Sequence, residues 1–138
     1  MRRRSTAPLA ALTPLLAALA GAALLTGCGA GPSTSLTVSA DPGESGPART
    51  WELTCDPAGG DHPAPAQACR SLETAETPFA PVPPDAECTL QYGGPQTATM
   101  TGTWRGEPVD AAFSRTDGCE IARWDAVQAA LVISGGVA

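Results

Sequence analysis

The chain has 138 residues and a formal net charge of −6, which leaves room for one small domain. Three of its eight basic residues are Arg2, Arg3 and Arg4, so the part after residue 27 has five arginines against fourteen acidic residues, a net charge of about −9. Nucleic-acid binding needs clustered Lys or Arg to displace counterions from phosphates, so this composition argues against a nucleic-acid partner.

The first 28 residues have the three parts of an export signal in order. Arg2-Arg3-Arg4 precedes an uncharged apolar run from Ala7 to Leu25. The stretch Leu25-Thr26-Gly27-Cys28 then matches the lipobox of bacterial lipoproteins, in which an aliphatic residue and two small residues precede the cysteine that receives the lipid. We therefore predict a lipoprotein signal peptide at 1–27 and a lipidated Cys28 that begins a short tether at 28–33. A domain at 34–138 would then be anchored in the cell membrane on its extracellular face.

Two other interpretations of this segment stay open. The apolar run is about as long as a bilayer requires, so it could be an uncleaved transmembrane anchor. Cleavage at an ordinary small-residue site nearby would release the domain without a lipid. The sequence also does not decide between the general secretion route and the twin-arginine route.

Alternating apolar and polar residues predict the first strands after the tether. Residues 36–38 alternate and end at a turn signal, Asp41-Pro42-Gly43. Residues 49–55 alternate again and place Trp51, Leu53 and Cys55 on one face. A turn-rich loop follows at 56–63.

A short helix is predicted next, followed by an irregular stretch. The helix starts near Pro65, with Ala68, Leu72 and Ala75 at helical spacing. Residues 77–84 contain four prolines, which exclude regular structure.

The last third of the chain predicts further strands. Residues 97–105 and 109–113 form a hairpin with its turn at 106–108, and the apolar run 129–134 is expected to be a buried strand. Taken together, these elements predict an α+β domain with a largely antiparallel sheet and one or two short helices. The three tryptophans, Trp51, Trp104 and Trp124, are expected to pack in the core.

The chain has five cysteines, an odd number that needs an explanation in an exported protein. Lipid attachment at Cys28 removes one. The remaining four are Cys55, Cys69, Cys88 and Cys119. In an oxidising compartment these predict two disulfides, with three pairings open, of which the local one joins neighbours along the chain. A zinc site is disfavoured because no C-x-x-C pair exists and the single histidine, His62, adjoins a proline in a loop.

Several segments stand in an order that resembles a known family. They are Leu53-Thr54-Cys55, His62-Pro63, Ala68-Cys69-Arg70-Ser71-Leu72, Cys88-Thr89, Thr101-Gly102-Thr103-Trp104-Arg105-Gly106, Phe113-Ser114 and Cys119-Glu120. The ordered set, with all four cysteines, resembles the Streptomyces subtilisin inhibitor-like family of serine-protease inhibitors over about residues 34–134. His62 matches a family histidine without a catalytic role, so a satisfied loop histidine is expected.

The resemblance implies a fold and a site. It implies one small domain with a five-stranded antiparallel sheet, two short helices, and the disulfides Cys55–Cys69 and Cys88–Cys119. The reactive bond of such an inhibitor would be Leu90–Gln91, with Thr89 and Tyr92 flanking it. A serine protease would be the partner, the protein would not be an enzyme, and no cofactor or metal is implied. Leucine before the cleaved bond suits subtilisin-like or chymotrypsin-like proteases. Some family members dimerise, so a homodimer stays open.

Two departures from the family bear on function. Typical members read Asp-Pro-Val after the tyrosine, whereas Tyr92 is followed by Gly93-Gly94-Pro95-Gln96, which predicts a freer loop. The lipid anchor is the second departure, because the best-known members are freely secreted. The alternative to a membrane-anchored inhibitor is a non-inhibitory cell-envelope lipoprotein that uses the same scaffold to bind a protein partner.

Overall fold

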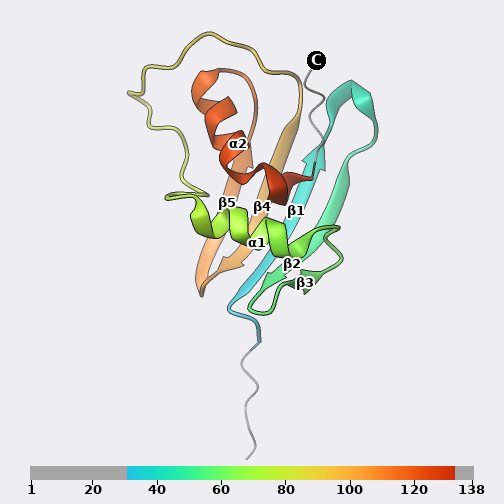
Figure 1. The fold of residues 1–138 in the computed structure, drawn as a ribbon. Coiled ribbons are helices and arrows are strands. Elements are labelled where there is room, and N and C mark those ends of the chain that lie inside the picture. The colour runs from blue at the N-terminus through green and yellow to red at the C-terminus, as the bar shows by residue number, and fades with distance from the viewer. Residues whose placement is uncertain (1–30, 133–138) are drawn as a thin grey trace, which may run out of the picture.

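Five strands form a single antiparallel sheet in the order β3-β2-β1-β4-β5 (Figure 1). The computed structural model describes residues 31–132, so the predicted signal peptide, Cys28 and residues 133–138 lie outside the described part. The strands are β1 Thr34–Asp41, β2 Arg49–Cys55, β3 Gly59–Gly60, β4 Thr97–Trp104 and β5 Glu107–Phe113. The helices are α1 Pro65–Thr74 and α2 Gly118–Leu131, with a short 3₁₀ turn, η1, at Gly43–Ser45. The predicted α+β fold with five strands and two helices is therefore confirmed.

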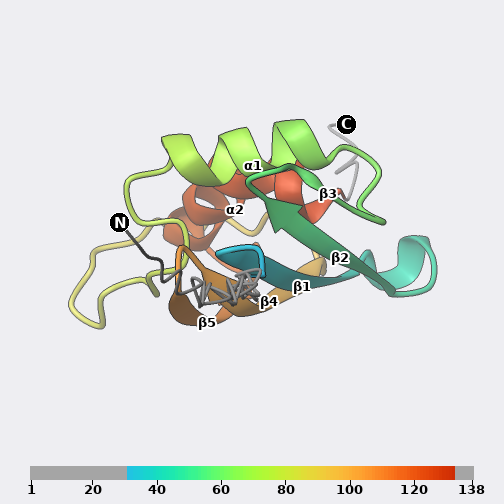
Figure 2. The same cartoon turned by 90° about the horizontal axis from the view of Figure 1, so that it is seen from below.

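Both helices cover the same face of the sheet, as Figure 2 shows. Apolar and polar residues alternate along the strands, because every second side chain points to the face that the helices cover. In β1, Leu36, Val38 and Ala40 are buried there, while Thr37 and Ser39 lie on the outer face. The outer face is polar: Thr37 donates a hydrogen bond to Glu52 on β2 at 2.9 Å.

The core lies between the sheet and the two helices. Its largest members are wholly buried: Leu36, Leu53, Leu72, Met100, Trp124 and Leu131. Trp51 and Trp104 are partly buried and pack against this cluster. The expectation of core packing is thus confirmed in full for Trp124, whereas Trp51 and Trp104 lie at the edge of the core.

The run 129–134 does not form a strand as far as it is described, and this prediction is wrong. Residues 129–131 are the last turn of α2. The run continues an apolar helix face that begins before residue 129. Trp124, Val127 and Leu131 have helical spacing and are all buried on one side of α2. The Asp117 side chain caps the helix start by accepting a hydrogen bond from the Glu120 backbone N–H at 2.9 Å.

The β4–β5 hairpin is present, but its turn is one residue earlier and shorter than predicted. Trp104 pairs with Glu107, so Arg105 and Gly106 form a two-residue turn, and both have positive φ. Pro108 lies inside β5 instead of in the turn. A proline is tolerated there because β5 is an edge strand of the sheet.

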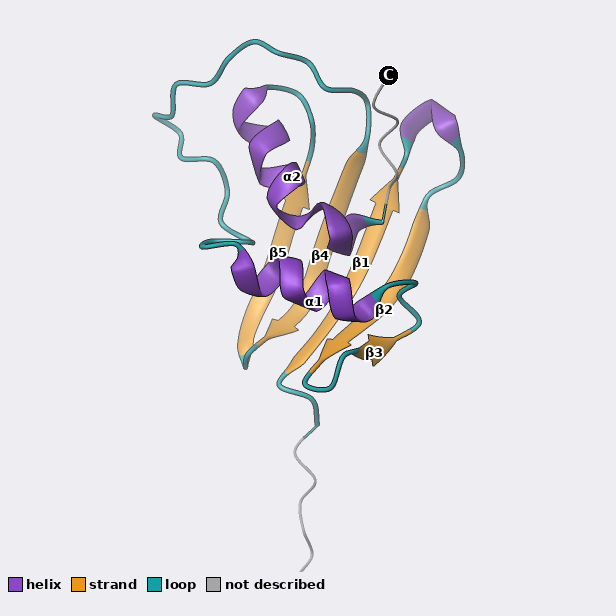
Figure 3. Ribbon diagram, in the orientation of Figure 1, coloured by secondary structure: helices purple, strands orange, loops and turns teal. Residues whose placement is uncertain are grey.

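The two ends of the sheet carry different parts of the chain. At one end the chain enters β1 beside the β4–β5 turn, where the Gly106 N–H donates to the Ser33 carbonyl at 2.9 Å. At the other end Asp41, the last residue of β1, pairs with Thr97, the first residue of β4. The long loop that joins α1 to β4 therefore returns to the sheet at the end opposite the point of entry (Figure 3).

Two disulfides fix the helices to neighbouring elements. Cys55 on β2 bonds to Cys69 on α1, with 5.9 Å between the Cα atoms. Cys88 in the long loop bonds to Cys119 on α2, with 5.3 Å between the Cα atoms. Both agree with the pairing that the family resemblance implied. Within residues 31–132, no helix is long and apolar enough to cross a bilayer.

Candidate functional site

The long loop at 75–96 has no helix or strand, and it exposes two large hydrophobic residues to solvent. The Leu90 side chain is 99% exposed, and Tyr92 is 65% exposed. These are the large hydrophobic residues that the described structure leaves in water. An apolar side chain presented in this way suits insertion into the pocket of a protein partner. We call residues 88–93 the Leu90 segment.

The amino-terminal side of the Leu90 segment is fixed to the start of α2. The Cys88–Cys119 disulfide makes a covalent link between them. The Gly118 N–H also donates to the Thr89 carbonyl at 3.1 Å. A methyl group on Gly118 would overlap the Thr89 hydroxyl, so the absence of a side chain allows this close approach.

The carboxyl-terminal side of the segment is fixed by Arg115, in the connection between β5 and α2. The Gly93 N–H donates to the Arg115 carbonyl at 2.7 Å. The Arg115 Nε–H donates back to the Gly93 carbonyl at 3.0 Å. Both backbone groups of Gly93 are therefore satisfied by one residue.

This geometry differs from the prediction that Gly93-Gly94 frees the loop. A Cβ on Gly93 would lie 2.8 Å from Ile121 Cδ1 and 3.1 Å from Arg115 Nε. The glycine at position 93 therefore permits close packing of the loop against α2. The backbone freedom inferred from the sequence is restrained by tertiary contacts at this position.

His62 has a structural role. Its side chain is buried, and its Nδ1 accepts a hydrogen bond from the Ala64 N–H at 3.1 Å. Nε2, which then carries the proton, donates to the Ala130 carbonyl at 3.0 Å. Both ring nitrogens are occupied, so the predicted role as a satisfied loop histidine is confirmed.

One group of side chains resembles a metal site only in the closeness of its atoms. The sulfur atoms of Cys88 and Cys119 lie close to the Asp117 carboxylate. The two cysteines form a disulfide and so offer no thiolate, and the carboxylate is engaged in capping α2. The group therefore lacks the set of free anionic ligands that a metal such as zinc would need.

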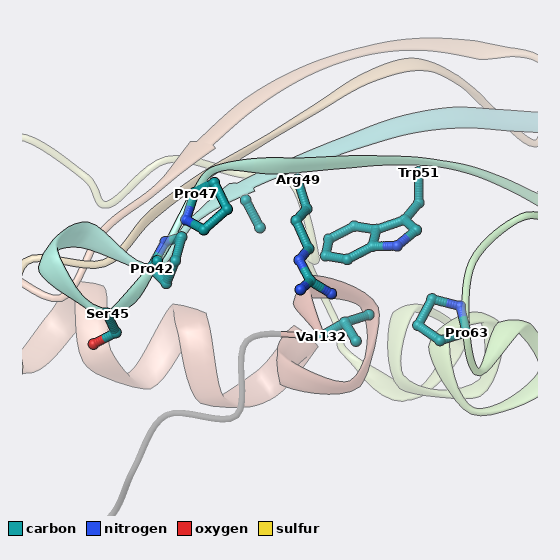
Figure 4. Close-up of a pocket in the computed structure, with 9 residues that line it drawn as sticks. Pro42, Ser45, Pro47, Arg49, Trp51, Pro63 and Val132 are labelled. Carbon is teal, nitrogen blue, oxygen red and sulfur yellow. The ribbon is translucent and has the colours of Figure 1, made fainter.

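A recess of about 500 Å³ lies near the end of α2, away from the Leu90 segment (Figure 4). In Figure 4 the Arg49 guanidinium and the Trp51 indole hang side by side from β2, with Val132 facing them. Prolines form much of the rest of the wall: Pro42, Pro47 and Pro63. No residue of the Leu90 segment lines this recess, so the two features are separate.

The four residues proposed from the resemblance lie together. Thr89, Leu90, Gln91 and Tyr92 are consecutive and exposed, as a presented peptide must be. Sequence reasoning missed the residues that hold them, Arg115 and Gly118. The spacing Asp117-x-x-Glu120 signals a helix start and could have predicted where α2 begins, although not that it packs beside the loop.

The comparisons with known proteins agree with this fold. The profile described as subtilisin inhibitor-like matches residues 31–116. The chain is 38% identical over 78 residues to subtilisin inhibitor-like protein 1 of Streptomyces cacaoi, covering 53% of this chain and 70% of that protein. It is 43% identical over 68 residues to a subtilase-type protease inhibitor of Streptomyces fradiae, covering 46% of this chain and 47% of that protein. With more than half of its length matched by the profile, this chain belongs to the subtilisin inhibitor-like family.

Proposed function

We propose that the domain inhibits subtilisin-like or chymotrypsin-like serine proteases and presents Leu90–Gln91 as the reactive bond. Family membership supports the proposal, and one of the relatives is itself a subtilase-type protease inhibitor. The observation that carries it is the Leu90 side chain, 99% exposed in a segment fixed on both sides. Residues before the reactive bond are called P1, P2 and P3, and those after it P1′ and onward, counted outward from the bond. Leu90 is then P1, Thr89 P2, Cys88 P3 and Gln91 P1′.

The fixed loop explains how a peptide bond can be presented to a protease without being consumed quickly. A segment held in an extended form docks with little loss of conformational entropy. Its main chain then pairs with the protease as an added strand, and the P1 side chain fills the S1 pocket. If the bond is cut, the Cys88–Cys119 disulfide keeps the new end at Leu90 attached to α2.

Leu90 supplies much of the recognition. Burying an exposed leucine side chain contributes roughly 1.5–3 kcal/mol, which corresponds to about 10- to 150-fold in the inhibition constant. Trypsin-like proteases place an acidic group in S1 and would gain nothing from leucine. Leucine therefore directs the domain toward apolar S1 pockets.

The predicted lipid anchor at Cys28 fits this role. Residues 29–33 would let Thr34 lie at most about 20–22 Å from the lipidated cysteine. β1 then runs about 26 Å to the other end of the sheet. Because the long loop returns to the sheet at that far end, the Leu90 segment would face away from the membrane. A surface protease could then reach it despite the short tether.

Titration of subtilisin and chymotrypsin with the domain from Ser33 onward tests the proposal. We expect stoichiometric inhibition at micromolar domain or below, and slow appearance of chain cut between Leu90 and Gln91 by mass spectrometry. The variant Leu90→Arg should lose chymotrypsin inhibition and gain trypsin inhibition, with unchanged unfolding, because the side chain is in water in the free domain. A folded wild-type domain that inhibits neither protease would reject inhibition.

The same experiment separates the alternative, a scaffold that binds another protein through a different surface. Leu90→Gly should weaken inhibition by at least about 10- to 150-fold in the first case and leave partner binding intact in the second. Unchanged inhibition by Leu90→Gly would refute the assignment of Leu90 as P1.

A further inference from the structure

Arg115 holds the part of the loop that a protease would release. In the proposed inhibitor Gln91 and Tyr92 are P1′ and P2′, and Gly93 is P3′. Residues 91–96 lie between the reactive bond and the start of β4. Within residues 31–132, the hydrogen bonds that join them to the rest of the domain are the two between Gly93 and Arg115. The first of these bonds is accepted by the Arg115 backbone carbonyl and would survive Arg115→Ala. The second is donated by the Arg115 side chain, which is the part of the residue that a substitution can remove.

The Arg115 side chain is itself fixed by α2. Its Nη1 lies 3.4 Å from the Asp125 carboxylate, and its guanidinium lies 5.7 Å from the centre of the Trp124 ring. Trp124 is wholly buried, and the Arg115 side chain is only 19% exposed. A planar guanidinium held by an ion pair and a ring loses little freedom when it donates to Gly93.

The chemistry of cleavage treats the two sides of the bond differently. The protease serine oxygen attacks the Leu90 carbonyl carbon, the bond to the Gln91 nitrogen breaks, and that nitrogen leaves as an amine after taking a proton. The Leu90 side is then an ester on the enzyme and remains tied to α2 through Cys88. Water completes hydrolysis if the amine leaves, whereas attack by the amine on the ester reforms the peptide bond and frees the serine.

We propose that Arg115 is a positioning residue that keeps the Gln91 amine within reach of the acyl-enzyme, and so decides whether the domain acts as an inhibitor or as a substrate. This rests on the proposed function of the Leu90 segment. The amine is only two residues from Gly93, so holding Gly93 confines it to a small volume. A high local concentration of the amine favours religation over hydrolysis.

The chain offers a matched control in Arg123. It forms an ion pair with Glu120 at 2.6 Å, lies 4.9 Å from the Phe113 ring centre, and donates to the Ala112 carbonyl at 3.2 Å. Arg123 therefore makes the same three kinds of contact as Arg115, but its hydrogen bonds go to α2 and β5 instead of the Leu90 segment. The variant Arg123→Ala therefore controls for a general loss of stability when an arginine with such contacts is removed.

The test compares Arg115→Ala with Arg123→Ala. Each is mixed with subtilisin, and mass spectrometry follows the cut between Leu90 and Gln91. We expect Arg115→Ala to be cut at least tenfold faster than wild type, with a higher final fraction of cut chain, and Arg123→Ala to match wild type. Equal cleavage of the two variants would overturn the proposal. Asp125→Asn removes the ion pair that holds the Arg115 guanidinium but keeps its N–H donors, so its cleavage rate should lie between those of wild type and Arg115→Ala. This variant also provides a test if Arg115→Ala fails to fold.

A second measurement does not depend on any protease. Backbone ¹⁵N relaxation of the free domain should show residues 91–94 equally ordered in wild type and in Arg123→Ala, and more mobile in Arg115→Ala, which keeps the backbone bond to Gly93 but loses the side-chain one. Unchanged order in Arg115→Ala would refute the positioning role. If wild type is neither bound nor cut by subtilisin or chymotrypsin, the inhibitor function fails, and the relaxation data still decide whether Arg115 holds the loop.

Discussion

The contact between Gly118 and Thr89 predicts a substitution that should harm inhibition without harming the fold. In Gly118→Ala the added methyl group would overlap the Thr89 hydroxyl and lie 3.3 Å from Thr89 Cβ. Either the Thr89 side chain must turn or the P2 residue must move away from α2. Movement would stretch the hydrogen bond from the Gly118 N–H to the Thr89 carbonyl, which is 3.1 Å long.

The two effects of this substitution have different magnitudes. Replacing glycine by alanine at a helix start gains at most about 1 kcal/mol of helix stability. Crowding between the new methyl group and Thr89 costs about 1–3 kcal/mol, and the strain falls on the loop. The free energy of unfolding should therefore fall by no more than about 3 kcal/mol. If about 1–2 kcal/mol of the strain is carried into the complex, the inhibition constant rises roughly 5- to 30-fold.

The assay is a double-mutant cycle with Gly118→Ala and Thr89→Ala, measured by subtilisin inhibition and by guanidinium unfolding. Thr89→Ala removes the crowded hydroxyl, so the double variant should recover to the level of Thr89→Ala alone. Gly31→Ala, made in a domain that starts at Gly29 together with its own wild-type reference, serves as a control, because its added carbon would meet nothing within 4 Å. Inhibition by Gly118→Ala within twofold of wild type would refute the reasoning, and so would failure of the double variant to recover.

Three further predictions concern the scaffold and the anchor. His62→Ala should lower the free energy of unfolding by about 2–3 kcal/mol, because a buried donor and acceptor lose their partner, and it should leave the inhibition constant unchanged. Replacing both Cys55 and Cys69 by alanine should lower the same free energy by about 3 kcal/mol, as expected for a closed loop of this length, while inhibition at 25 °C persists. An inhibition constant that rises in parallel with the stability loss in either variant would contradict their purely structural roles. Cys28→Ser should move the protein from the detergent phase to the aqueous phase after phase partition, and retention in detergent would show that the lipid is not the anchor.

The sequence by itself determined much of the sheet. Alternation in residues 36–38 and 49–55 predicted strands with the correct inward faces, because the period of two depends only on local geometry. The cysteines limited the pairing to three choices, and the ordered motifs pointed to one of them. The assignment of Leu90–Gln91 as the reactive bond, two residues after Cys88, comes from the family resemblance and stays a prediction.

The run at 129–134 shows where local patterns were insufficient. A short apolar run fits a buried strand or the end of a buried helix equally well. The burial of Trp124 and Val127 against the sheet decided for the helix, since these residues continue the same apolar face. A window that began at Asp117 would have favoured the helix, because Asp117-x-x-Glu120 signals a helix start and Trp124, Val127 and Leu131 have helical spacing.

The holding of the Leu90 segment was decided by tertiary structure. Two adjacent glycines predict a freer loop, because each has more backbone conformations to lose. Gly93 and Arg115 are 22 residues apart in the sequence, and they meet only because β5 and α2 bring the arginine beside the loop. Hydrogen bonds between distant residues depend on where the elements pack, so these restraints on the loop are visible only in the folded domain.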